Sequence, residues 1–207
     1  MVVERTVLEL RGVSCLSLEE VASPRKEIIS SRSFGQLVTD LGELRQAVAS
    51  YTARAAEKLR RQHSVTNALQ VFLQTNPHKE GEPQYHPGIV VRLVEPTDDT
   101  RLLSGHAVRG LEKIYKPGYR YQKAGVMLMG LADAKTAQPD LFSRSSERAA
   151  SQSKHLMQTL DQINAKLGRG TLRLAAEGHR QAWKVRTACP SPGYTTRWTD
   201  LPIAYAR

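Results

Sequence analysis

Cysteine is scarce in this sequence, because only Cys15 and Cys189 occur among its 207 residues. The two lie far apart, and neither belongs to a Cys-x-x-Cys or a Cys/His pattern. The sequence therefore indicates neither a disulfide framework nor a zinc site. We expect both residues to be buried or incidental thiols of a cytoplasmic protein.

Long apolar runs are also absent. No stretch approaches the roughly 20 apolar residues that a membrane-spanning helix needs. The start, MVVERTVLELRG, carries two acids and two arginines instead of the apolar centre of a signal peptide. We expect a cytoplasmic protein that has no membrane partner.

No catalytic constellation is recognisable. Asp98 and Asp99 resemble paired carboxylates, but they precede a helical pattern and suit its cap better than a metal. Gly168-Arg169-Gly170 is too short for a phosphate-binding loop and is typical of a turn. The six histidines are scattered without metal-binding spacing: His63, His78, His86, His106, His155 and His179. We therefore expect no catalytic residue, no metal site and no cofactor in this chain.

Positive charge is plentiful. Lysine and arginine total 30 against 20 acidic residues, which gives a formal net charge of +10. Such an excess favours a polyanionic partner, and nucleic acid is the commonest one. The alternative is a basic protein without such a partner. The hydrophobic content of 40% is normal for a globular protein, so global disorder is not expected.

Hydrophobic periodicity predicts an α+β domain. Two helices are expected, one capped by Asp40 and one by the Asp98-Asp99 pair. The strands are expected over 26–34, 64–75, 88–93 and 119–130. The order strand, helix, strand, strand, helix, strand is that of a split βαβ fold. It predicts a four-stranded sheet with both helices on one face and the other face open.

The rest of the chain divides around this domain. Residues 1–22 contain a short helix and a loop, and 23–133 form the sheet domain. Residues 134–152 are polar and are expected to be a flexible linker. Residues 153–207 are expected to form a small α+β domain, with a helix over 155–167 and strands over 171–178 and 181–186.

Several motifs resemble those of the UmuC family of translesion DNA polymerases, in its C-terminal half and over nearly the whole chain. KEIISSRSFG, SYTARAAEKLR and GYRYQKAGVML are similar to its little-finger domain. VVERTVLELRG is similar to the last helix of its thumb, and NAKLGRGTL and SPGYTTRWTDLP to its final domain of unknown role. The resemblance implies error-prone synthesis past DNA damage in the SOS response, with 23–133 gripping DNA.

The family's catalytic carboxylates, which hold magnesium ions, lie in a palm domain that has no counterpart in this sequence. The resemblance therefore implies that any Mg²⁺ belongs to the palm of a larger parent polymerase. We expect the chain to be inactive as a polymerase by itself, as a fragment, a truncated frame or a separated domain.

Two polar groups are candidates for DNA contact. Arg32 is flanked by Ser31 and Ser33 at the polar end of one strand, and Lys123 follows Gln122 in another. Basic groups and hydroxyls bind phosphate oxygens whatever the base sequence. The resemblance implies this role for them in gripping a duplex. The alternative is that they are solvated surface charges.

A candidate clamp-binding peptide follows the sheet domain. Gln138-Pro139-Asp140-Leu141-Phe142 resembles the pentapeptide that binds the bacterial β sliding clamp. The Gln amide would enter a polar pocket, while Leu141 and Phe142 would fill an apolar cleft. The alternative is that the apolar pair anchors the linker to its own domain.

The family resemblance also implies protein partners, a UmuD dimer and RecA. A module that contacts these proteins and binds little DNA is the second hypothesis for the chain. The final segment carries Trp183, Tyr194, Trp198 and Tyr205, which could serve such a contact. They are equally suited to form the core of a small domain.

Overall fold

The fold is described from a computed structural model, which describes residues 2–15, 24–79, 81–135, 147–185 and 191–203. The regular elements follow the expected order within the sheet domain. They are α1 (Val2–Leu10), β1 (Ile28–Val38), α2 (Leu41–Arg61), β2 (Ser64–Thr75), β3 (Gly88–Thr97), α3 (Thr100–Ile114), β4 (Tyr121–Asp133), α4 (Glu147–Leu167) and the short 3₁₀ helices η1 (Ala175–Glu177) and η2 (Trp198–Asp200).

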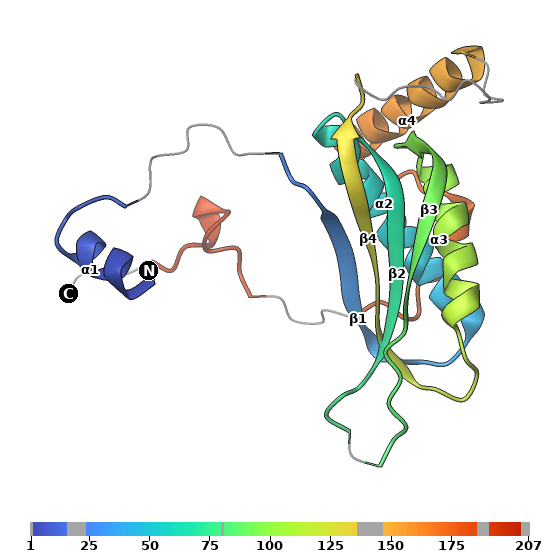
Figure 1. Cartoon of the computed structure of the whole chain (residues 1–207), viewed down its shortest axis with the longest axis horizontal. Coiled ribbons are helices and arrows are strands. Elements are labelled where there is room, and N and C mark those ends of the chain that lie inside the picture. The colour runs from blue at the N-terminus through green and yellow to red at the C-terminus, as the bar shows by residue number, and fades with distance from the viewer. Residues whose placement is uncertain (1, 16–23, 80, 136–146, 186–190, 204–207) are drawn as a thin grey trace.

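The four strands form one antiparallel sheet in the order β1-β4-β2-β3 (Figure 1). β1 and β2 run in the same direction with β4 between them, and β3 and β4 do so with β2 between them. Each strand–helix–strand unit is thus split by a strand of the other. The predicted split βαβ fold is confirmed.

Helix starts lie where the sequence places the caps. The Asp40 carboxylate accepts a hydrogen bond from the Glu43 amide at 2.8 Å, and the Asp99 carboxylate accepts one from the Arg101 amide at 2.8 Å. Each bond satisfies an amide that has no partner within the first turn of its helix. The caps therefore fix where both crossover helices begin.

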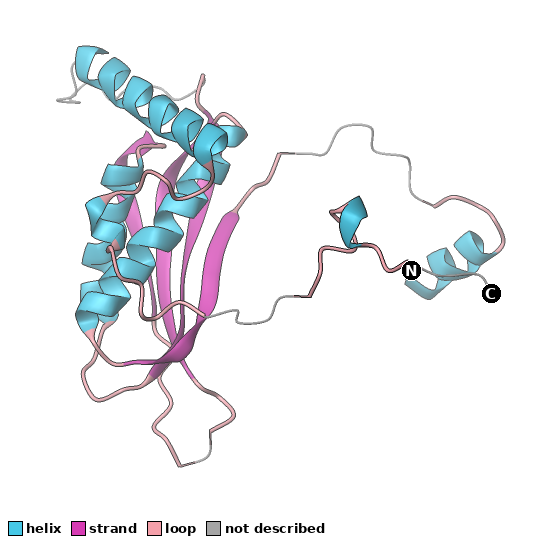
Figure 2. Ribbon diagram, turned by 180° about the vertical axis from the view of Figure 1, so that it is seen from behind, coloured by secondary structure: helices cyan, strands magenta, loops and turns pink. Residues whose placement is uncertain are grey.

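The core lies between the two helices and one face of the sheet. Figure 2 shows α2 and α3 together on that face. The buried side chains recur at helical spacing on the helices and at every second position on the strands. The largest fully buried ones are Tyr51, Tyr121, Ile28, Leu44, Leu59, Leu69, Leu73, Leu103, Leu111, Leu128, Met157 and Val38. No described helix covers the other face, as expected.

Helix α4 packs across the ends of α2 and α3 through Met157, which is buried, and through an ion pair. The Arg60 guanidinium bonds both Asp161 carboxylate oxygens, at 2.6 and 2.8 Å. The same guanidinium also donates to the Asp98 carbonyl and the Thr100 hydroxyl. Since a half-buried charge is costly without partners, this network favours the docked position of α4.

A second polar contact joins α4 to the cap of α3. The Ser153 hydroxyl and the Arg101 guanidinium both donate to the Asp99 carboxylate. Burial alone would raise the pKa of Asp99, but these hydrogen bonds outweigh burial and hold it below the usual range. The charged Asp99 carboxylate therefore both caps α3 and binds the Ser153 hydroxyl of α4.

Residues 168–185, called the strap below, cross the outer side of the helices and reach the edge of β1. The Trp183 ring is 4% exposed and meets the Tyr51 and Phe34 rings edge-on, at centroid distances of 5.6 and 6.3 Å. The Trp183 carbonyl accepts a hydrogen bond from the Gly35 amide at 3.1 Å. One residue thus closes the core and caps an edge strand.

Several boundaries differ from those expected. β1 continues through Gly35 to Val38, and α4 begins at Glu147 rather than near 155. The strands expected over 171–178 and 181–186 are wrong, because the described residues of the strap contain no strand. Leu172 and Leu174 alternate there, but a 3₁₀ turn begins at Ala175 and Gly178 has a φ of +74°. Among the described residues, no helix is long and apolar enough to cross a membrane.

The two tryptophans offer a matched test of the strap. Trp183→Ala should lower the free energy of unfolding by about 3 kcal/mol, because it empties a filled core position. Trp198 is 89% exposed, so Trp198→Ala should change stability by less than about 0.5 kcal/mol. Urea unfolding followed by circular dichroism measures both. Equal effects of the two substitutions would show that Trp183 does not hold the strap in place.

Candidate nucleic-acid interface

The uncovered face of the sheet is set by the alternation of its strands. Leu69, Val71 and Leu73 point into the core, so the residues between them point outward. The strand register then assembles this open face row by row: Ser33, Lys123 and Gln74; Ser31, Gly125, Phe72 and Gly88; Ile29, Met127, Gln70 and Val90; Met129, Ala68 and Arg92. These rows contain two basic side chains and no carboxylate.

Phe72 and Gly125 shape the middle of the open face. A Cβ at position 125 would overlap both the Phe72 ring and the Ser31 Cβ. Because Gly125 has no side chain, the Phe72 ring can lie directly against the backbone of β4. The result is an apolar centre bordered by hydroxyl, amide and basic groups.

The structure brings most of the predicted DNA-contact residues together. Ser33 pairs with Lys123, and Ser31 lies one row away on the same face. Gln122 lies beside Lys123 at a register shift between β4 and its neighbours. These residues occupy one corner of the open face, where β1 meets β4.

Arg32 does not share that face. As the residue between Ser31 and Ser33, it points to the opposite side, where it lines a cavity with Ser50 and Arg54 of α2. Arg32 therefore lies on the opposite side of the sheet from Ser31, Ser33 and Lys123. A phosphate contact by Arg32 stays a prediction.

Other members of the open face were missed from the sequence. Arg92 lies opposite Ala68, and Gln70 and Gln74 lie in the rows on either side of Phe72. The alternation of β2 identifies the two glutamines, because both lie between buried positions. Arg92 becomes significant only once the β2–β3 register is known.

The remaining candidates lie elsewhere. Gln138, Asp140, Leu141 and Phe142 fall outside the described residues. Of the final aromatics, Trp183 is in the core, whereas Tyr194 and Trp198 are exposed. Tyr205 also falls outside the described residues. No group of three or more His, Cys, Asp or Glu side chains that could hold a metal occurs in the described part of the chain.

Comparison with protein families gives two matches. Residues 25–141 match the C-terminal domain of the impB/mucB/samB family, and residues 154–204 match a domain of unknown function. The first match contains all four strands of the sheet and both crossover helices, α2 and α3. The second begins within α4 and contains the strap.

Curated relatives match along nearly all of this chain. Protein UmuC of Salmonella typhimurium is 49% identical over 201 residues, which are 97% of this chain and 47% of the relative. Proteins SamB and ImpB of the same organism are 43% and 41% identical over 204 residues, which are 99% of this chain and 47% of each relative. The chain thus spans about half the length of these relatives.

Solved structures give weaker likenesses. The DinB structure from Sulfolobus solfataricus has a TM-score of 0.37 at 9% identity, covering 50% of this chain and 28% of that one. The little finger domain of PolIV, solved in complex with the beta-clamp processivity factor, has a TM-score of 0.37 at 10% identity, covering 58% of this chain and 97% of that one.

The contact between Phe72 and position 125 can be tested by a double-mutant cycle. Gly125→Ala should destabilise the domain by about 1–3 kcal/mol, because the new methyl overlaps the ring. Combined with Phe72→Ala, its additional cost should shrink. Gly105→Ala is the control, since nothing lies within 4 Å of a Cβ there and alanine favours its helix. Strict additivity in urea unfolding would contradict the contact.

Proposed function

The chain belongs to the impB/mucB/samB family, whose C-terminal domain covers more than half of it, and we propose that it grips DNA for a translesion DNA polymerase. Its sequence corresponds to the C-terminal region of UmuC-like Y-family polymerases. We propose that the parent protein copies damaged DNA in the SOS response. The chain itself would supply binding and tethering rather than chemistry.

The open face carries the proposal. Lys123 and Arg92 supply positive charge, and Ser31, Ser33 and the glutamines supply donors for phosphate oxygens. The rows between them contain no acidic side chain that would repel a phosphate. An uncovered sheet face of this kind can lie along a duplex and hold its backbone through several such groups.

The chemistry of these groups suits a damaged template. Phosphate and sugar contacts fix the position of a protein on a duplex but carry no sequence information. They are also independent of the state of the base. A polymerase that must hold DNA around a lesion therefore gains from a surface of small donors and isolated cations.

We predict that the full chain binds duplex DNA without sequence preference and that binding weakens steeply with salt. In Lys123→Ala/Arg92→Ala, the slope of log K against log salt should fall by about 1.8, because two phosphate contacts are lost. Fluorescence anisotropy with a labelled duplex, measured at several salt concentrations, gives both the affinity and the slope.

The control removes two cations from the opposite side of the molecule. Arg109 and Lys113 are exposed on α3, so Arg109→Ala/Lys113→Ala changes the net charge equally. It should leave duplex affinity within about twofold, since distant charges are screened. If both double variants weaken binding equally, net charge and not the open face holds DNA.

We also propose that residues 138–142 tether the chain to a β sliding clamp. The segment places a glutamine and a Leu-Phe pair just after the sheet domain. A short peptide of this kind that becomes ordered on binding gives modest affinity, on the order of micromolar. Tethering would nevertheless raise the local concentration of the open face at DNA.

Leu141→Ala/Phe142→Ala should weaken binding of the full chain to the clamp by at least about tenfold, because two buried apolar groups are lost. Surface plasmon resonance with immobilised clamp measures the change. The control is Val3→Ala/Leu10→Ala, which truncates two apolar residues that are exposed on α1. Unchanged clamp binding by the first variant would rule out the peptide.

A further inference from the structure

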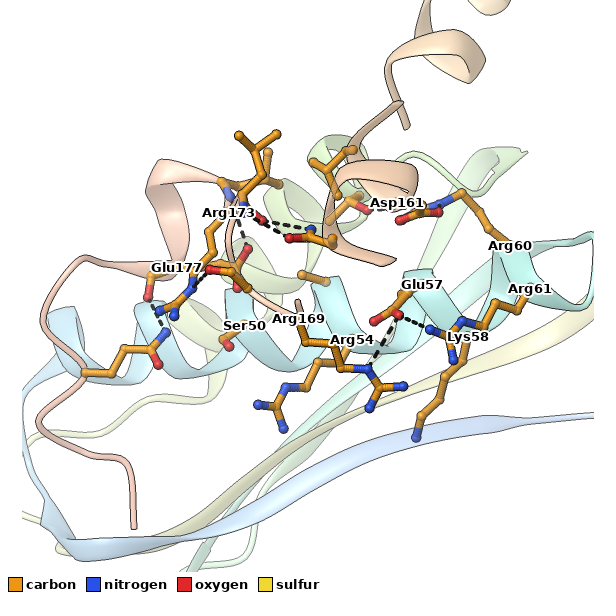
Figure 3. Close-up of a pocket in the computed structure, with 18 of the residues that line it drawn as sticks. Ser50, Arg54, Glu57, Lys58, Arg60, Arg61, Asp161, Arg169, Arg173 and Glu177 are labelled. Atoms are coloured by element: carbon orange, nitrogen blue, oxygen red, sulfur yellow. Dashed lines mark hydrogen bonds and ion pairs between the residues drawn. The ribbon is translucent and has the colours of Figure 1, made fainter. Parts of the chain in front are cut away.

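The helix side of the molecule contains a second basic surface. A cavity of about 320 Å³ opens between α2, α4, the strap and β1 (Figure 3). Its walls therefore come from both the sheet domain and the segment that follows it. The cationic side chains that line it are Arg32, Arg54, Lys58, Arg60, Arg61, Arg169, Arg173 and Lys184.

The carboxylates in the same walls are already engaged. Asp161 is paired with Arg60 at 2.6 Å, and Glu57 accepts from Arg61 at 2.5 Å, with Arg169 at 3.9 Å. Glu177 accepts a hydrogen bond from the Leu174 amide, and burial raises its pKa. Asp161 and Glu57 are therefore already paired. Glu177 acts electrostatically on two of the other cations, Arg173 and Arg54.

Five of the eight cations form no ion pair within 4 Å among the described residues, and all five are exposed: Arg32, Arg54, Lys58, Arg173 and Lys184. They come from three different elements, yet they face one cavity. Figure 3 shows Arg54 and Lys58 pointing from α2 toward β1. Like charges collected in this way favour an anionic ligand.

The charges form a row rather than a single cluster. A neighbouring cavity of about 330 Å³ is lined by Arg25, Ile28, Gln62 and again by Lys58 and Arg61. The two cavities share Lys58 and Arg61 and lie next to each other beside β1, and together they are called the basic groove below. From Arg54 to Arg61 the groove follows α2 for about 10 Å, at 1.5 Å per residue. An extended polyanion suits this shape better than a compact ion.

We propose that this basic groove binds the phosphate backbone of an unpaired nucleic acid strand. A positively charged groove that follows the backbone is the common device for single strands. Among the described residues, the lining includes no aromatic side chain, so base stacking is not expected to contribute. Binding should therefore be independent of base sequence.

An acidic peptide fits the groove less well. An extended peptide that binds beside a sheet gains most from main-chain hydrogen bonds to a free edge strand. The edge of β1 is already occupied at Gly35, whose amide donates to the Trp183 carbonyl. A phosphodiester backbone has no amides to satisfy and needs only the cations.

The position of the groove connects it with the open face, and to this extent the inference rests on the proposed function. Ser31 and Ser33 face the proposed duplex site, and Arg32 between them faces the groove. A strand that leaves a duplex on the open face need only pass the edge of β1 to enter the groove.

The test uses the full chain and a labelled oligothymidylate, which forms no duplex. The variant Arg54→Ala/Lys58→Ala/Lys184→Ala should bind this probe at least about tenfold more weakly, with a salt slope reduced by about two, since three contacts are lost. Its affinity for a labelled duplex should stay within about twofold. Arg109→Ala/Lys113→Ala/Lys154→Ala removes equal charge from exposed positions outside the groove and should leave both probes unaffected.

Three outcomes would overturn the groove. They are unchanged oligothymidylate binding by the groove variant, an equal loss in the control, and displacement of the probe by poly-glutamate as effectively as by unlabelled oligothymidylate. The open-face variant Lys123→Ala/Arg92→Ala tests the proposed function separately. If the open-face variant leaves duplex binding unchanged while the groove variant weakens oligothymidylate binding, the proposed duplex site is wrong and the groove proposal is supported. If the groove variant leaves oligothymidylate binding unchanged while the open-face variant weakens duplex binding, the groove proposal is wrong and the proposed function is supported.

Discussion

The architecture depends on one constraint: each strand can bury only every second side chain, and both crossover helices lie on the same face of the sheet. Both crossover helices of the sheet domain, α2 and α3, cover the same face, so neither is left to cover the other face. The opposite face must then be stable in contact with solvent or a partner. Phe72 lies there against Gly125, and the hydroxyl, amide and basic groups around it keep the surface polar.

The strap adds a third layer that the sheet domain does not itself require. Trp183 completes the core beside Tyr51, and the Arg60–Asp161 pair holds α4. Together these contacts hold α4 and the strap, which form one wall of the basic groove, opposite α2 and β1, which form the other. They are made by a few side chains rather than by a broad apolar face. The groove therefore depends on residues far apart in the sequence.

Local sequence signals were sufficient for most of the sheet domain. Asp40 and Asp99 mark helix starts because a capping side chain acts within one turn. The alternation of Leu69, Val71 and Leu73 predicts which face of β2 is buried. The same alternation, applied to Ile28 and Phe34, already separates Arg32 from Ser31 and Ser33.

The strap could not be predicted in the same way. Leu172 and Leu174 alternate as they would in a strand, but the Leu172 amide and carbonyl both bond the Asn164 side chain of α4. Leu174 lies beside α3, which comes some seventy residues earlier in the sequence. Trp183 likewise has no local pattern that distinguishes it from Trp198. Its burial follows from the space between Phe34 and Tyr51, which exists only in the folded domain.

Strand β1 links the two basic surfaces. Because its side chains alternate, Ser31 and Ser33 serve the open face while Arg32 serves the groove. The edge between them is closed at Gly35 by the Trp183 carbonyl, so neither surface can extend by adding a strand there. A polyanion can pass this edge only by contact with side chains. The two surfaces are therefore joined in space and remain separable by substitution, since no side chain of β1 belongs to both.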